Sequence, residues 1–269
     1  MASQYFGRLS EVFHRHSLLG SFHSHRATTL SVLCVALALP FAIRDYLTFL
    51  SYGPGGLPYN VVGWLASNVA RLIAAEQLST SVYDDPNLPH ADEPSFLPTS
   101  FPPHRESPRP RIGPHPVPQR QLQQLPNEEV KHTLLDRFAK LGKHAQEKGL
   151  VELRTSRFER HHDAYFVSKT QQWHSIAQAT GGEIAHVHDG KDNSIHVVLH
   201  PADCKAVLDA GWGQRHAFSG VDTRKILGFA LPVNYVLVYA PRDDAEVDIA
   251  MGIIRAAIAF MTGSREDLG

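Results

Sequence analysis

The sequence predicts an α+β fold, a mainly antiparallel sheet with flanking helices, preceded by an N-terminal transmembrane helix. The first indication is a run of 17 residues without charge, from Ala27 to Ile43. The second is a group of short period-two segments between residues 151 and 239, without the regular strand–helix alternation of a parallel sheet. The third is a pair of amphipathic helical patterns that flank this group, at 128–148 and 243–261.

Composition sets limits on function but names no partner. The chain has 269 residues, enough for one domain with appendages, and 26 basic against 27 acidic side chains give it a formal charge of -1. No overall field therefore attracts nucleic acid, and we predict no nucleic-acid partner. Two cysteines, Cys34 and Cys204, form neither a disulfide framework nor a zinc pattern. Nine of the 17 histidines precede residue 150, so histidine frequency alone does not indicate a metal. The oligomeric state is left open.

The chain divides into six predicted segments. They are a polar N-terminal tail (1–26), a transmembrane anchor (27–44), a membrane-proximal helical segment (45–83), a proline-rich segment (84–126), the α+β domain (127–263) and a C-terminal tail (264–269).

The apolar run is expected to be a single-pass membrane anchor. A helix of that length rises about 25 Å, at the lower end of what spans a hydrocarbon core. A cleaved signal peptide and a buried helix of a soluble domain are the alternatives. Three arginines precede the run and Arg44 follows it closely, which favours a cytosolic N-terminus and places the domain across the membrane.

The two segments before the domain are less regular. Residues 61–78 have a helical pattern, expected either to lie on the membrane surface or to pack on the domain. Residues 84–126 contain 12 of the 18 prolines, a composition that prevents regular helices and central strands. The residues alone therefore predict a linker there.

Within the domain, local patterns predict each element in turn. A helix runs from Glu128 to about Lys148, two strands follow at 151–158 and 164–168, and residues 171–180 are helical or irregular. A hairpin is expected from strands at 183–188 and 194–199. The remaining predicted elements are a short helix at 201–210, a loop at 211–216, a buried strand at 235–239, and a last helix that opens with the capping box of Asp243 and Glu246.

The hairpin carries three histidines that share one face, His186, His188 and His196. Three interpretations stay open. Imidazoles that converge from one face can ligate zinc, iron or manganese. They can also be hydrogen-bonded side chains of a polar pocket. Alternatively, a histidine paired with Asp189 or Asp192 can act as a general base near neutral pH.

A second group of candidates lies after the hairpin. Trp212, between two glycines and followed by Gln214, Arg215 and His216, is typical of an aromatic wall with donors beside it, which suits a flat, anionic, oxygen-rich ligand. Arg242 follows a strand and precedes a helix, a natural position for binding an anion. The alternative for both arginines is a structural ion pair. Hydrolase, kinase and dinucleotide motifs are absent from the sequence.

These stretches together resemble the fungal luciferases, membrane-associated enzymes that oxidise a hydroxylated hispidin. The matching stretches are Glu183-Ile184-Ala185-His186-x-His188-Asp189-x-x-Asp192-x-x-x-His196, Gly211-Trp212-Gly213-Gln214-Arg215-His216, Tyr239-Ala240-Pro241-Arg242, Arg44-Asp45-Tyr46-x-Thr48-Phe49-Leu50, Tyr83-Asp84, Arg109-Pro110-x-Ile112, His115, Gln119-Arg120-Gln121 and Thr155-Ser156-x-Phe158-Glu159. The resemblance extends from the anchor to Thr262. It implies that residues 109–121 are ordered on the domain, and it supports the membrane anchor, in the endoplasmic reticulum or another endomembrane.

The resemblance implies an oxygenase that acts on a 3-hydroxy-2-pyrone of the 3-hydroxyhispidin type. Dioxygen is the co-substrate, a cyclic peroxide forms and loses carbon dioxide, the excited product can emit light, and no metal or organic cofactor takes part. Such chemistry needs a base, cations for the enolate and a dry aromatic wall. The expected catalytic residues are His186, His188, Asp189, Asp192 and His196. The expected substrate-binding residues are Trp212, Gln214, Arg215, His216, Tyr239, Arg242 and His115.

Two alternatives remain beside this enzyme. A non-luminescent homologue would act on another small phenolic or pyrone substrate. A membrane-tethered binding protein would keep the fold without turnover. Convergence of the histidines and arginines in one closed pocket favours an enzyme, and their dispersal favours the binding protein.

Overall fold

The computed structural model describes residues 26–224 and 230–268. They divide between two compact units, one that ends at Ser51 and one that begins at Tyr52, and each unit is described by itself. Most of the predicted polar tail, residues 1–25, lies outside the described residues.

The first unit is represented by one helix, α3 (Arg26–Ser51), which contains Pro40. Its most apolar 18-residue window has a mean hydropathy of 1.8, so this helix of 26 residues is long and apolar enough to cross a membrane. The predicted anchor at 27–44 lies within it, and the helix continues to Ser51. A helix of this length rises about 39 Å, more than the roughly 30 Å of a hydrocarbon core.

The second unit is built on a six-stranded antiparallel sheet with the strand order β1-β2-β3-β4-β6-β5. The strands are β1 (Val151–Thr155), β2 (Asp163–Val167), β3 (Glu183–Val187), β4 (Ile195–Val198), β5 (Gly213–Arg215) and β6 (Tyr235–Val238). The first four strands form a meander, and β5 then occupies the edge beyond β6. The predicted α+β class is confirmed.

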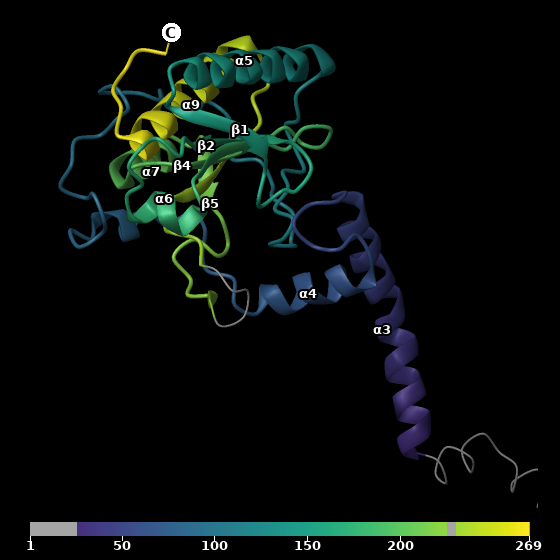
Figure 1. Cartoon of the computed structure of the whole chain (residues 1–269). Helices are drawn as coiled ribbons and strands as arrows, with labels where there is room; N and C mark the ends of the chain where they lie inside the picture. The colour runs from purple at the N-terminus through teal and green to yellow at the C-terminus, as the bar shows by residue number, and fades with distance from the viewer. Residues whose placement is uncertain (1–25, 225–229, 269) are drawn as a thin grey trace, which may run out of the picture. The chain divides into compact units, whose positions relative to one another are not determined.

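Two long helices lie together on one side of the sheet, α5 (Glu128–Glu147) and α9 (Asp244–Thr262) (Figure 1). Each begins at a side-chain cap: Asn127 accepts a hydrogen bond from the Val130 amide, and Asp243 accepts one from the Glu246 amide, both at 2.9 Å. The apolar stripes of both helices and the strand residues that face them form the hydrophobic core. Two short helices, α6 (Ser175–Thr180) and α7 (Pro201–Asp209), connect strands.

Helix α4 (Val61–Arg71) packs on the domain through its small residues. The buried Ser67 hydroxyl donates to the Val117 carbonyl at 2.8 Å. The predicted helix at 61–78 ends earlier because the next residues bond to the domain backbone: the Ala75 amide donates to the Ala217 carbonyl at 2.8 Å. Val62, Leu65, Val69 and Leu72 form an apolar stripe that is 53–84% exposed.

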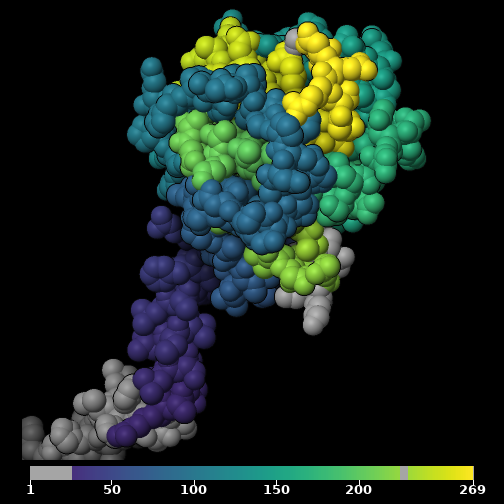
Figure 2. All heavy atoms as spheres, turned by 90° about the vertical axis from the view of Figure 1, so that its left-hand side faces the viewer, coloured from purple at the N-terminus to yellow at the C-terminus, as the bar shows by residue number. Residues whose placement is uncertain are grey.

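The proline-rich segment, which includes the short 3₁₀ helix η1 (Ser81–Asp84), also packs on the domain. Leu97 belongs to the core, and its amide donates to the Asp203 carboxylate of α7 at 3.2 Å. The Arg105 amide donates to the Ala210 carbonyl at 2.8 Å. In Figure 2 the segment, drawn in blue, surrounds the green surface of α7. The ordered part thus begins before residue 109. Prolines keep this segment out of a β-sheet, and its backbone amides donate to side chains and loop carbonyls instead.

The predicted loop at 211–216 contains the edge strand β5, which differs from expectation. Gly213 pairs with Val238, and a Cβ atom at Gly213 would lie 2.5 Å from the Leu237 carbonyl oxygen. The missing side chain of Gly213 therefore permits β5 to approach β6 closely. From composition alone, the same glycines favoured a loop.

Candidate active site

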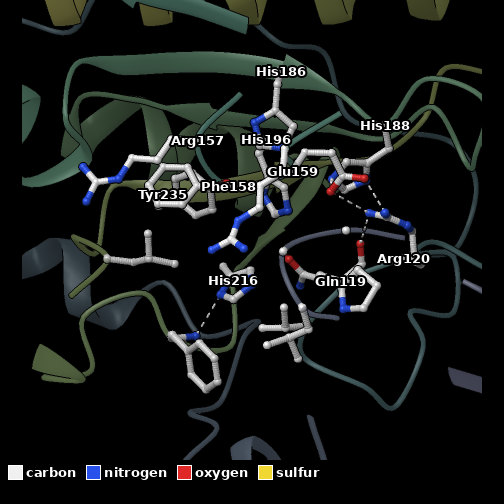
Figure 3. Close-up of a pocket in the computed structure, with 18 of the residues that line it drawn as sticks. Gln119, Arg120, Arg157, Phe158, Glu159, His186, His188, His196, His216 and Tyr235 are labelled. Atoms are coloured by element: carbon white, nitrogen blue, oxygen red, sulfur yellow. Dashed lines mark hydrogen bonds and ion pairs between the residues drawn. The ribbon is translucent and has the colours of Figure 1, made fainter. Parts of the chain in front are cut away.

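A partly open cavity of about 410 Å³ lies on the face of the sheet that carries the histidines. Hairpin side chains form one wall, Ala66 and Ala70 of α4 another, and residues 117–120 and 157–160 close the sides. Figure 3 shows His186, His188 and His196 directed into this space, with Glu159 and Arg120 beside them. The volume is in the range of ordinary small-molecule sites.

The hairpin brings the three histidines together by strand register. His186 of β3 pairs directly with His196 of β4, and the alternate residues Ala185 and Val187 belong to the core. His188 follows β3 and stays in register because its amide donates to the Ser194 carbonyl at 2.9 Å. The ring centroids are 5.4 Å apart for His186 and His188, 5.3 Å for His186 and His196, and 5.0 Å for His188 and His196.

A buried carboxylate orients His186. Its Nδ1 lies 2.7 Å from Glu183 Oε1. The Ser156 hydroxyl and the Arg157 amide each donate to the same carboxylate at 2.7 Å. Since the carboxylate accepts, the proton of the imidazole is on Nδ1, and Nε2 is left toward the cavity.

His188 is oriented in the same way by Asp192. Its Nδ1 lies 3.2 Å from Asp192 Oδ1 and 3.0 Å from the hydroxyl of Ser194, which itself donates to Asp192 at 3.0 Å. Burial would raise the pKa of Asp192, but its electrostatic interaction and hydrogen bond with His188, the charge of Arg120 and the Gln121 amide lower it. Burial also lowers the pKa of His188, as does the charge of Arg120, so the neutral imidazole is favoured.

His196 is held by a backbone carbonyl and an aromatic ring. Its Nδ1 lies 3.3 Å from the Val236 oxygen, and its ring stacks on Tyr235 with the centroids 4.7 Å apart. Burial, together with the neighbouring histidines, lowers the pKa of His196 well below its ordinary value. Burial raises the pKa of the Tyr235 phenol, which therefore stays neutral.

A buried ion pair between Glu159 and Arg120 forms the side of the cavity. Glu159 Oε2 lies 3.9 Å from His188 Nε2. Arg120 also donates to the carbonyls of Tyr52 and Pro54, at 3.2 Å each. Burial would raise the pKa of Glu159, but its electrostatic interaction with His188 and its ion pair with Arg120 lower it, so the carboxylate stays ionised.

His216 is the one predicted substrate-binding residue in the cavity lining. Its Nδ1 accepts a hydrogen bond from the Phe218 amide at 3.1 Å, and its ring also bonds to the Pro116 backbone. Burial lowers the pKa of His216 to about 3. The ring is therefore a neutral wall and supplies no positive charge for an enolate.

The other predicted substrate-binding residues lie outside the cavity lining. Arg215 pairs with Glu76 at 3.2 Å, and Arg242 donates to Glu246 at 2.8 Å, as structural ion pairs do. The indole of Trp212 donates to the Pro103 carbonyl at 2.6 Å. The Tyr239 hydroxyl donates to Gln214 at 3.1 Å. His115 packs under α4, with its Nδ1 3.2 Å from the Ser67 hydroxyl.

The predicted catalytic set divides in a similar way. The three histidines line the cavity, and Asp192 stands behind His188. Asp189 lies outside the lining, with a side chain that is 42% exposed and 3.7 Å from His162.

Several lining residues carried no chemical signal of their own in the sequence. They are Gln119, Arg120, Arg157, Phe158, Glu159, Phe218 and Tyr235. Four of them, Gln119, Arg120, Phe158 and Glu159, lie in stretches that carry the family resemblance, which was the available signal.

Comparisons with known proteins agree with this resemblance. The sequence model of a family described as the luciferase domain matches residues 181–257. The chain is 35% identical over 264 residues to a luciferase of Armillaria mellea, and the alignment covers 91% of this chain and 93% of the relative. It is 33% identical over 262 residues to a luciferase of Neonothopanus nambi, covering 94% of this chain and 93% of that relative. No solved structure gives a significant match. The chain belongs to the fungal luciferase family.

The luciferase-domain match covers the part of the site that the sheet supplies. Residues 181–257 include β3, β4, β5 and β6 and the first part of α9, and so the three histidines. Arg120, Glu159 and the α4 wall precede the match. The cavity of this luciferase-family chain is therefore completed by segments outside the luciferase domain.

Proposed function

We propose that this protein is a membrane-anchored oxygenase that oxidises a 3-hydroxy-2-pyrone of the 3-hydroxyhispidin type with dioxygen and releases carbon dioxide. The convergence of three oriented histidines in one cavity is the observation that carries the proposal. Relatives over most of the chain are named luciferases, which supports the same class of reaction. A binding protein without turnover has no need of paired histidines and carboxylates buried around one space.

The cavity supplies the groups that this chemistry needs. Nε2 of His188, held in place through Asp192, takes the proton of the pyrone hydroxyl. Arg157 lines the cavity and balances the charge of the resulting enolate. The buried Gln119 Oε1 has no hydrogen-bond partner among residues 26–224 and 230–268, so it is free to accept a hydrogen bond from a phenolic hydroxyl.

The enolate carbon then adds dioxygen. The resulting peroxide attacks the lactone carbonyl and displaces the ring oxygen, which forms a four-membered cyclic peroxide. Its O–O bond and the C–C bond between its two carbons then break, which releases the lactone carbon as carbon dioxide and leaves a carbonyl group on the other carbon. Both oxygen atoms and the electron pairs are accounted for without an outside reductant. Phe158, Phe218 and Tyr235 keep water from the product, which favours light emission.

The apolar helix α3 anchors this enzyme in a bilayer. Its length and hydropathy support a single-pass span, and an endomembrane such as the endoplasmic reticulum suits a hydrophobic aromatic substrate.

The test is to mix the detergent-solubilised protein with 3-hydroxyhispidin in air while photons, oxygen uptake and carbon dioxide are recorded together. We expect all three signals, and we expect His188→Ala to lose them. His144→Ala changes an exposed histidine of α5 and serves as the matched control. Oxygen uptake without light would identify the non-luminescent homologue. Tight binding of the pyrone without oxygen uptake would identify the binding protein and contradict the proposal.

A further inference from the structure

The three cavity histidines have an arrangement that an acid–base site does not require. One ring nitrogen from each of His186, His188 and His196 can be chosen so that all three lie within 4.8 Å of one another, and all three residues are buried. A single general base needs one imidazole and one orienting partner. Here three imidazoles meet.

Hydrogen bonding determines which nitrogens meet. Each Nδ1 faces an acceptor: Glu183 at 2.7 Å, Asp192 at 3.2 Å and the Val236 carbonyl at 3.3 Å. Carboxylates and carbonyls only accept, so each Nδ1 carries the proton and each Nε2 presents a lone pair. This outer arrangement is the usual one around metal-bound histidine.

Lone pairs that face the same space repel unless a cation or a donor lies between them. Nε2 of His186 and of His196 has no hydrogen-bond partner in the described part of the chain. The fourth imidazole of the cavity, His216, is excluded as a ligand because both of its nitrogens are engaged. The site is therefore built for three nitrogens and not for four.

The spacing of the rings agrees with a tetrahedral ion. With metal–nitrogen bonds of about 2.0–2.1 Å at tetrahedral angles, imidazole centroids around one ion lie about 5 Å apart. The three observed separations are 5.0, 5.3 and 5.4 Å.

We propose that His186, His188 and His196 bind one divalent first-row transition metal through Nε2, with its open position toward the cavity. Three imidazoles suit zinc, cobalt, iron, nickel or copper. The family resemblance implies a reaction without metal, so the site is not a property carried over from the family. The ionised carboxylate of Glu159, 3.9 Å from His188 Nε2, adds negative charge that favours a cation.

A metal here deepens the proposed function, and this part of the inference rests on it. A 3-hydroxy-2-pyrone has two adjacent oxygens, on the hydroxyl carbon and the lactone carbonyl, which form a chelating pair. An ion there, expanding from four to five ligands, would hold the enolate by both oxygens and lower the pKa of its hydroxyl. It would then replace Nε2 of His188, which it occupies, in promoting loss of the proton.

The test measures metal and not only activity. Full-length protein carrying no histidine tag is purified in detergent, and bound metals are counted by plasma mass spectrometry. We expect about one transition metal per chain. After chelation, titration with Co²⁺ should produce the visible absorption of tetrahedral nitrogen coordination. A triple variant with His186→Asn, His188→Asn and His196→Asn should lose both signals, while His144→Asn should keep them.

Milder variants keep the test decisive if the triple variant does not fold. Asp192→Asn and Glu183→Gln retain the shape of the outer partners and should weaken Co²⁺ binding about 10- to 100-fold. Circular dichroism establishes that each variant is folded. Folded wild-type protein without metal and without the cobalt spectrum would overturn the proposal, as would equal binding by a folded triple variant.

Oxygen uptake with 3-hydroxyhispidin separates this inference from the proposed function. If chelated and reloaded protein oxidise the pyrone at the same rate, the metal takes no part in the reaction and the oxygenase stands. If the metal binds at the three histidines and no oxidation occurs, the metal site stands and the oxygenase does not.

Discussion

Buried carboxylates, paired with histidines or with an arginine, decide the chemistry of the cavity. Each of the two hairpin carboxylates lies within four residues of the histidine that it orients, so local geometry suffices to pair them. Arg120 and Glu159 are 39 residues apart in sequence and are both at least 95% buried as side chains. That pair therefore forms only in the completed fold. Because both side chains are buried, water cannot replace either partner.

Arg120→Met is therefore expected to destabilise the protein strongly. Removing one partner of a buried pair leaves the other as an uncompensated charge, which costs about 3–5 kcal/mol. Chemical denaturation of the detergent-solubilised protein measures the free energy of unfolding. Arg111→Met, at an exposed position, is the matched control. Equal stability of the two variants would mean that the Arg120–Glu159 pair contributes little.

At the scale of elements, several helices begin at histidine or acidic caps. The ring of His174 caps α6: its Nδ1 accepts from the Ala177 amide at 3.4 Å, and its Nε2 lies 3.2 Å from the Phe260 carbonyl of α9. Only the neutral imidazole satisfies both contacts. Burial lowers the pKa of His174, and the adjacent ring of His90 lowers it further, while Phe260 and Glu93 oppose these effects.

This cap predicts a loss of stability in mild acid. The imidazole titrates near about 6.5 when the chain is unfolded, and lower when it is folded. A base with a depressed pKa stabilises the fold fully above its unfolded pKa, and this contribution is lost as the pH falls below about 6.5. His174→Asn keeps a capping oxygen without titration. We expect its melting temperature to fall less than that of the wild type between pH 8 and pH 5.5. The exposed His132→Asn variant should behave as the wild type does.

Helix α4 has two different faces. Ala66 and Ala70 line the cavity, while the stripe of Val62, Leu65, Val69 and Leu72 is exposed. Nine residues separate the end of α3 at Ser51 from the start of α4 at Val61, a connection that spans about 35 Å at most. If α3 spans a bilayer, α4 stays near its surface, and the stripe has a lipid interface to enter.

A dye attached at Leu65→Cys should therefore report a lipid environment. In liposomes carrying the full chain, with Cys34 replaced by Ser, we expect a blue-shifted emission that spin-labelled lipids quench. Lys140→Cys on α5 is the control, since its side chain is 74% exposed. Identical, solvent-like emission from both positions would show that the stripe does not enter the interface.

At the scale of the whole molecule, the hydrophobic cluster that packs on the sheet lies in the second unit. Every residue of the buried hydrophobic cluster lies between Tyr83 and Met261. The cavity lining also begins at Gly55, after α3 has ended. The cluster and the cavity lining therefore contain no residue of α3.

A fragment of residues 52–269 is expected to fold and to keep its melting temperature within a few degrees of the full chain. It should also be released from membranes by carbonate washing, because it lacks α3. Circular dichroism and membrane fractionation measure these two properties. The full chain with the same treatment is the control, and an unfolded fragment would mean that α3 takes part in the domain fold.

The sequence by itself determined the central hairpin and most elements of the domain, but not β5. Period-two alternation places His186, His188 and His196 on one face wherever the strands pair in register, because side-chain direction in a strand is a local property. The α+β class followed from the same local periodicities, and the capping box of Asp243 and Glu246 predicted the start of α9.

Only the tertiary structure decided what surrounds the histidines. Trp212, Arg215 and Arg242 have the chemistry of a binding site, but β5 pairs at the sheet edge and partners such as Glu76 and Glu246 engage the two arginines outside the cavity. The segments that close the cavity come from α4, from the proline-rich segment and from the β1–β2 connection. Their contacts join residues far apart in sequence. Side-chain burial and long-range packing therefore decided which residues line the cavity, and no local pattern encodes them.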